Sequence, residues 1–125
     1  MARILIIDDE QDFRRTVRAF LEAEDHEVFE ASNGINGMEE FRNVQPELVV
    51  TDILMPHQDG IETIRQIRQI APDVKIIAIS GGGQFSASAF LMIADDSGAN
   101  RSLEKPIRRN RFMAEVNQLL PKPSK

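Results

Sequence analysis

Largely apolar runs of a few residues alternate along this 125-residue chain with longer stretches whose apolar residues recur every three or four positions. Such runs predict strands buried on both faces, because a strand with one wet face alternates polar and apolar residues. The candidate strands cover residues 3–7, 27–31, 48–51 and 74–79, with a weaker fifth at 100–103. Buried strands separated by amphipathic stretches indicate a parallel sheet built from βα units. The sequence therefore predicts an α/β domain.

Five amphipathic stretches predict the helices that cover this sheet. Residues three or four positions apart share one face of a helix. Three stretches carry such apolar stripes: Phe13, Val17, Phe20 and Leu21; Ile61, Ile64, Ile67 and Ile70; and Phe112, Val116, Leu119 and Leu120. Two shorter helices are expected at residues 35–43 and 84–95. A proline follows the last stripe, so residues 1–121 are expected to form one domain and 122–125 a short tail.

Charge and composition exclude several classes of protein. The net charge of −5 disfavours sequence-independent binding to nucleic acid, which needs clustered positive charge. Arg108, Arg109 and Arg111 form a basic cluster that a solvated helix face explains. The chain has no cysteine, so disulfides and thiolate chemistry are excluded. The apolar start at residues 4–7 is too short for a signal peptide or a membrane span, so a cytoplasmic setting is expected.

Polar residues follow four of the five candidate strands. Asp8 and Asp9 come after the first, Asp52 after the third, Ser80 after the fourth and Lys105 after the fifth. An isolated pair of aspartates in that position is most simply a helix cap, and an isolated lysine is most simply a surface residue. The carboxyl ends of parallel strands are, however, where ligands bind in open α/β sheets. Four coincident positions favour one shared site.

Three carboxylates in one pocket repel one another and raise their pKa values unless a cation lies among them. Mg²⁺ prefers such hard oxygen ligands, whereas zinc would require histidine or cysteine. Three carboxylates carry −3, and Mg²⁺ together with the Lys105 ammonium carries +3. A carboxylate is also an established nucleophile, and phosphoryl transfer requires mainly positioning and charge stabilisation. A metal, an ammonium and a hydroxyl such as that of Ser80 suit an aspartyl phosphate.

Four segments, in this order and spacing, resemble the receiver domain of response regulators: ILIIDDE, TDILMPHQDG, IAIS and LEKP. The resemblance covers essentially the whole chain. It implies a flavodoxin-like, doubly wound, five-stranded parallel sheet of order 2-1-3-4-5 with five helices. It also implies Mg²⁺ as the cofactor, a histidine kinase or phosphotransfer protein as the phosphoryl donor, and a downstream protein as the target.

The resemblance assigns the phosphoacceptor and the metal ligands. Asp52 corresponds to the residue that is phosphorylated in the family. Asp9 and Asp52 would bind Mg²⁺ directly, together with the backbone carbonyl of Leu54. Asp8 would act on the metal through a water molecule.

The resemblance also assigns the groups around the phosphoryl oxygens. Lys105 and Ser80 would contact them, and the Lys105-Pro106 peptide is often cis in related proteins. Asp59-Gly60 is a turn signal in its own right, and it would begin the following helix.

The sequence departs from the family pattern at several positions that govern switching. Ser102 stands where receivers usually carry an aromatic ring on the fifth strand. Leu54 and Gly82 occupy the two positions that commonly tune phosphoryl lifetime, and neither has an acid, base or amide side chain. Gly81 and Gly82 lie in the loop 80–84, whose glycines permit large φ/ψ changes. This loop is therefore expected to carry the switch.

These observations predict a single-domain response regulator that accepts a phosphoryl group on Asp52 and signals through protein contacts. It would catalyse only its own phosphorylation and dephosphorylation. Two alternatives remain, namely a pseudo-receiver adaptor that is never phosphorylated and a phosphohydrolase with an aspartyl intermediate. The Asp-x-Asp motif expected of the phosphohydrolase is missing from the sequence. The sequence leaves the oligomeric state open, a monomer included.

Overall fold

The computed structural model of the chain describes residues 2–53, 60–81, 92 and 97–120. A five-stranded sheet with the order β2-β1-β3-β4-β5 forms its centre, and all four strand pairs are parallel. The strands are β1 (Arg3–Ile7), β2 (Glu27–Ala31), β3 (Leu48–Asp52), β4 (Lys75–Ser80) and β5 (Arg101–Glu104). The predicted α/β class and the flavodoxin-like strand order are confirmed.

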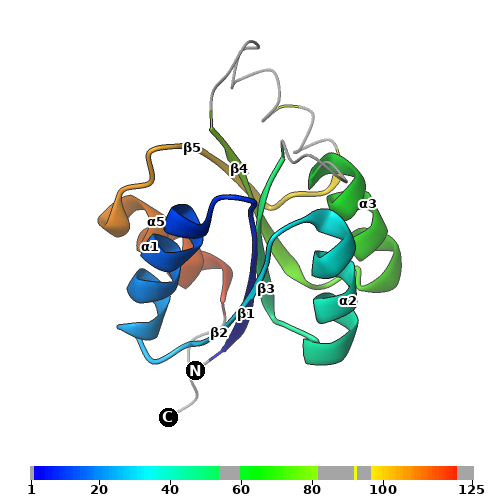
Figure 1. The fold of residues 1–125 in the computed structure, drawn as a ribbon, viewed down its shortest axis with the longest axis horizontal. Helices are drawn as coiled ribbons and strands as arrows, with labels where there is room; N and C mark the ends of the chain where they lie inside the picture. The colour runs from blue at the N-terminus through cyan, green and yellow to red at the C-terminus, as the bar shows by residue number, and fades with distance from the viewer. Residues whose placement is uncertain (1, 54–59, 82–91, 93–96, 121–125) are drawn as a thin grey trace.

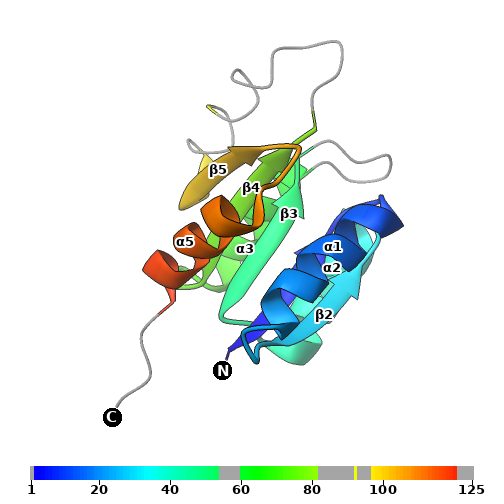
Figure 2. The same ribbon diagram turned by 90° about the vertical axis from the view of Figure 1, so that its left-hand side faces the viewer.

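Helices cover both faces of the sheet (Figures 1 and 2). On one face lie α1 (Gln11–Glu22) and α5 (Arg109–Leu119), and on the other lie α2 (Gly34–Val44) and α3 (Gly60–Ile70). The described residues thus contain four of the five expected helices. The helix expected at 84–95 falls outside them apart from Met92, as does the expected tail.

Two apolar clusters pack the two faces of the sheet. Alternate residues of β1 point in opposite directions, so Ile4 and Ile6 pack towards α1 and α5, and Leu5 and Ile7 pack towards α2 and α3. All four side chains are fully buried. Burial on both faces explains the unbroken apolar run, and it contributes about 1.5–3 kcal/mol for each such side chain.

One residue of a predicted apolar stripe lies outside the core. Ile70 was expected to pack with Ile64 and Ile67, but its side chain is 51% exposed. It is the last residue of α3 and lines a shallow surface hollow with Phe41 and Pro46. The helical period gives the direction of a side chain but not the point at which the neighbouring surface ends.

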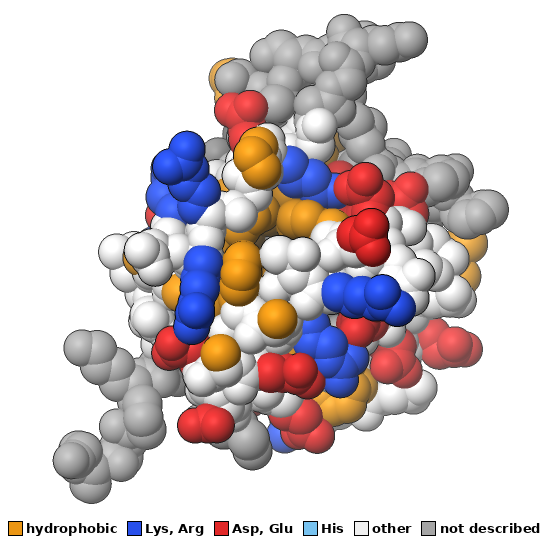
Figure 3. All heavy atoms as spheres, turned by 60° about the vertical axis from the view of Figure 1, so that its left-hand side comes forward, with side chains coloured by type: hydrophobic (Ala, Val, Ile, Leu, Met, Phe, Trp, Pro, Cys, Tyr) orange, Lys and Arg blue, Asp and Glu red, His pale blue; other side chains and the backbone are white. Residues whose placement is uncertain are grey.

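The face built by α1 and α5 carries apolar side chains at its centre, with basic and acidic side chains around them (Figure 3). The partly buried apolar residues that pack on this side of the core are Phe13, Phe20 and Ile107. Arg108, Arg109 and Arg111 are exposed, as expected for a solvated helix face. No described helix is long and apolar enough to cross a membrane.

Candidate functional site

Three carboxylates meet at the carboxyl-terminal edge of the sheet. Each of Asp8, Asp9 and Asp52 offers an oxygen that lies within 4.8 Å of the others. They converge because β1 and β3 are neighbouring parallel strands in which Ile7 lies opposite Thr51. The next residues, Asp8 and Asp52, therefore reach the same edge of the sheet. Asp8 and Asp52 are buried, whereas Asp9 is exposed. The group is therefore closed towards the core and open towards solvent, as a hydrated cation requires.

Lys105 reaches this acidic group from the far end of the sequence. Its Nζ lies 3.0 Å from Asp8 Oδ2 and 3.4 Å from Asp52 Oδ2. The backbone N–H of Lys105 donates to the Ser80 carbonyl at 2.8 Å, and the Lys105-Pro106 peptide is cis. A Cβ atom on Gly81 would lie 3.2 Å from Lys105 Cδ, so a glycine there leaves room for the lysine stem.

Two buried polar atoms at this edge accept or donate no hydrogen bond among the described residues. One is Oγ of Ser80, the last residue of β4, which is 1% exposed. The other is Oδ2 of Asp8, which faces Lys105 as an ion pair without hydrogen-bond geometry. An unsatisfied buried polar atom costs about 1–3 kcal/mol, so its retention needs a reason. The carboxylate oxygens suit a hard cation, and the hydroxyl suits an anionic oxygen.

The helix-cap alternative for the two aspartates does not hold. Glu10 is the N-cap residue of α1, and its side chain makes no capping hydrogen bond. Asp8 Oδ1 instead accepts the Glu10 backbone N–H at 2.8 Å, which fixes the turn ahead of the helix. Asp8 Oδ1 thus stabilises the turn before α1, whereas Asp8 Oδ2 faces the Lys105 ammonium.

Burial and like charge shift the ionisation of this group. Burial raises the pKa of Asp8 to about 6, and the negative charge of Asp52 adds to this rise. The hydrogen bond from the Glu10 backbone N–H and the charge of Lys105 lower the same pKa but do not offset the effect of burial. Burial lowers the pKa of Lys105, but the carboxylates of Glu10, Asp8 and Asp52 outweigh it and hold that pKa above its ordinary value. Lys105 is therefore a fixed cation, while Asp8 is a carboxylate that a bound cation would stabilise.

The shifted pKa of Asp8 makes the stability of the metal-free protein depend on pH. The pKa rises from 3.8 in the unfolded chain to about 6 in the folded state, so between these values only the folded state retains the proton. We expect the free energy of unfolding to fall across this range by ~3 kcal/mol at most as the pH rises. Urea denaturation in EDTA measures it. Asp8→Asn should lack this pH dependence of the free energy of unfolding, and it should be more stable than wild type at neutral pH. If the free energy of unfolding changed equally with pH in the two proteins, the expectation would be contradicted.

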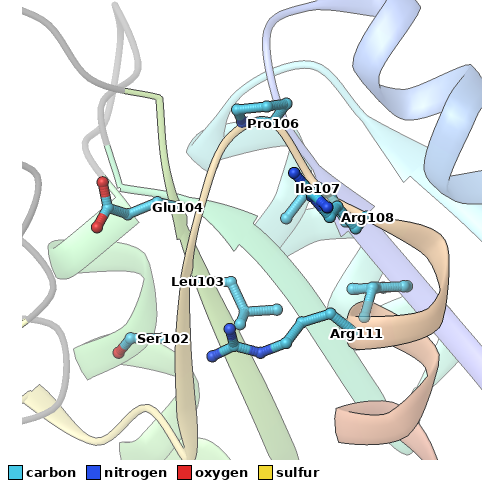
Figure 4. Close-up of a pocket in the computed structure, with 8 residues that line it drawn as sticks. Ser102, Leu103, Glu104, Pro106, Ile107, Arg108 and Arg111 are labelled. Carbon is cyan, nitrogen blue, oxygen red and sulfur yellow. The ribbon is translucent and has the colours of Figure 1, made fainter.

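A separate hollow of about 280 Å³ lies beside β5 and the start of α5 (Figure 4). Its lining includes the apolar residues Leu103, Ile107 and Phe112. It also includes the cationic residues Arg108 and Arg111. The side chains of Ser102 and Glu104 project from the other side of β5 (Figure 4).

The structure thus brings together the four charged candidates, Asp8, Asp9, Asp52 and Lys105, with Ser80 on the adjacent strand. Gly81 borders Lys105, and Ser102 lies on β5 beside the separate hollow, with its side chain on the opposite side of the strand. Leu54, Gly82 and most of the loop 80–84 lie outside the described residues.

Two residues at the site escaped the sequence reasoning. Glu10 Oε1 lies 2.5 Å from Lys105 Nζ, and the Phe13 ring centroid lies 4.3 Å from the same nitrogen. The available signal was position: Glu10 directly follows the aspartate pair, and Phe13 is three residues further along the first helix. The apolar stripe already explains Phe13 as a core residue, so the helical period gives no sign of its cation–π contact with Lys105.

Comparisons with known proteins agree with this geometry. The family model of the response regulator receiver domain matches residues 4–117. The chemotaxis protein CheY of Thermotoga maritima is 33% identical over 118 residues, which cover 94% of this chain and 96% of that protein.

Solved structures show the same likeness. A response regulator receiver domain protein from Clostridium thermocellum has a TM-score of 0.87 and 29% identity, covering 95% of this chain and 94% of that one. NtrX from Brucella abortus, in complex with ADP, has a TM-score of 0.88 and 29% identity. The match covers 95% of this chain but 27% of the longer NtrX chain. The chain belongs to the response-regulator receiver domain family of two-component signalling.

Proposed function

We propose that this chain is a Mg²⁺-dependent switch that accepts a phosphoryl group on Asp52 from a histidine kinase or a phosphotransfer protein and signals through protein contacts. The observation that carries the proposal is the Ser80 hydroxyl, which is buried on the strand next to Asp52 and has no hydrogen-bond partner among the described residues. With the Lys105 ammonium 3.4 Å from Asp52 Oδ2, it provides a donor and a cation for an added phosphoryl group.

In the proposed transfer, an Asp52 carboxylate oxygen attacks the phosphorus of a phosphohistidine. The phosphorus–nitrogen bond breaks, and the donor imidazole leaves as a neutral ring after taking up a proton. Lys105 offsets the charge added to the carboxylate, and the Ser80 hydroxyl donates to a phosphoryl oxygen. Attack of water on the phosphorus of the acyl phosphate then breaks its bond to the Asp52 oxygen, which releases inorganic phosphate and returns Asp52 to a carboxylate.

Asp8, Asp9 and Asp52 would hold Mg²⁺, with the backbone carbonyl of Leu54 as a further ligand. When bound, the ion supplies positive charge that offsets the carboxylates and the transferring phosphoryl oxygens. The fit rests on the three carboxylate oxygens that lie within 4.8 Å of one another, on two buried residues and one exposed residue. Receiver domains as a family bind Mg²⁺ at an acidic pocket of this kind.

Mg²⁺ should stabilise the fold, because an ion that binds only the native state adds RT ln(1 + [L]/Kd), about 1.4 kcal/mol at roughly tenfold excess over Kd. Asp9→Ala should lose most of this gain, since Asp9 is the exposed carboxylate of the group and its removal leaves the core intact. Thermal unfolding during a Mg²⁺ titration measures the effect. Asp73→Ala, which removes an exposed carboxylate outside the acidic group, serves as the control. Equal Mg²⁺ shifts in the two variants would count against the metal assignment.

Mass spectrometry after incubation with acetyl phosphate and Mg²⁺ separates the proposal from its two alternatives. A phosphoryl adduct on Asp52 supports the switch. Turnover of added phosphoesters would favour a phosphohydrolase, for which the sequence lacks the Asp-x-Asp motif. Neither adduct nor turnover would favour an adaptor that is never phosphorylated.

A further inference from the structure

Glu10 occupies the N-cap position of α1, but its side chain does not cap the helix. It is the N-cap residue of α1 and has extended backbone angles, but its carboxylate accepts no backbone N–H of the helix. Its Oε1 instead lies 2.5 Å from Lys105 Nζ, across 95 residues of sequence. The Glu10 side chain therefore contributes to an ion pair between distant segments and not to the end of the helix.

Among the described residues that pair with the Lys105 ammonium, Glu10 lies nearest to it. The Nζ atom lies 2.5 Å from Glu10 Oε1, 3.0 Å from Asp8 Oδ2 and 3.4 Å from Asp52 Oδ2. The Phe13 ring, also on α1, lies 4.3 Å from the same atom and adds a cation–π contact. The ammonium is thus shared between Glu10 and Phe13 at the start of α1 and the carboxylates of Asp8 and Asp52.

We propose that Glu10 is a positioning residue that holds Lys105 near the start of α1 and competes for it with a phosphoryl group on Asp52. This inference rests on the proposed function of Asp52. Phosphorylation then weakens the Glu10–Lys105 ion pair, which lowers the population of the phosphorylated state at a given donor concentration. Glu10 thereby sets how strong a phosphoryl donor is needed.

The size of the effect follows from the exposure of the pair. The Lys105 side chain is 14% exposed and the Glu10 side chain 61% exposed, so solvent screens the attraction. Measured exposed ion pairs predict a change in equilibrium of about two- to fivefold. Glu10→Gln is the sharpest variant, because it removes the charge while keeping the side-chain length and an oxygen that can accept from Lys105.

The test uses beryllofluoride as a phosphoryl mimic at saturating Mg²⁺, with binding followed by fluorine NMR. Glu10→Gln should bind it about three times more tightly than wild type. Asp12→Asn is the matched control, since it removes one acidic charge from the first turn of the same helix and no Asp12 side-chain contact to Lys105 is found among the described residues. It should bind like wild type, and all three proteins should have the same melting temperature.

A second pair of variants tests whether Glu10 acts through the lysine. In a Lys105→Met background, adding Glu10→Gln should change beryllofluoride affinity no more than adding Asp12→Asn. An undiminished gain there would show direct charge repulsion and overturn the positioning role. Equal affinities of wild type and Glu10→Gln would overturn the inference while leaving the phosphorylation proposal intact. Failure of wild type itself to bind would remove both.

Discussion

Asp52→Asn should abolish Mg²⁺-dependent phosphorylation by acetyl phosphate. The amide that replaces the carboxylate is not a nucleophile, and no other described carboxylate lies beside both Lys105 and Ser80 at the end of a strand. We expect the rate of adduct formation to fall by at least about a thousandfold, equivalent to about 4 kcal/mol in the barrier. Time-resolved mass spectrometry of the intact protein, followed by mapping of the modified peptide, measures this.

The variant should remain folded, so that the loss reports on chemistry. Asn has nearly the shape of Asp, and the change removes one of three mutually repelling carboxylates. We therefore expect the metal-free Asp52→Asn protein to be at least as stable as wild type in urea. An adduct that forms at the wild-type rate in this variant would place the phosphoacceptor elsewhere and refute the assignment of Asp52.

Gly60→Ala should destabilise the fold by about 3 kcal/mol or more, at the upper end of the cost of overpacking. A Cβ atom built on Gly60 would lie 1.9 Å from the Asp52 carbonyl oxygen and 2.5 Å from Ile53 Cα. Both are backbone atoms, which cannot relieve the overlap by a change of rotamer as a side chain can. Gly60 begins α3, and its N–H donates to the Ile53 carbonyl at 3.1 Å, so the helix start and the end of β3 are locked together.

Gly37→Ala is the control for this prediction. A Cβ atom there would approach only the Ile7 side chain, at 2.6 Å from Cδ1, and replacing a helical glycine by alanine regains about 1 kcal/mol of helix propensity. Urea denaturation should therefore show a much smaller loss for Gly37→Ala than for Gly60→Ala. Because a shift at Gly60 displaces Asp52, the Gly60 variant should also be phosphorylated more slowly. Equal stability of the two variants would show that α3 can move away from β3 at little cost.

Local pattern was sufficient to predict most of the fold. The run Ile4, Leu5, Ile6, Ile7 is apolar at every position because both faces of β1 are buried, and that is visible without any contact map. The same holds for the sheet edge at which Asp8, Asp52 and Lys105 meet, because parallel strands present their carboxyl ends on one side. Strand limits were off by a residue, since Asp52 and Ser80 end their strands rather than follow them.

What the sequence determined by itself was which residues lie on which face and at which end of the sheet, since the periods of helices and strands are properties of the local backbone. Only the tertiary structure decided the distances between them. It placed Lys105 nearer to Glu10 than to Asp52, left Ile70 exposed at the end of α3, and brought Gly60 against the backbone of β3. Each of these depends on how separate elements pack, and a contact between distant segments is set by the volume and charge of both partners rather than by either segment alone.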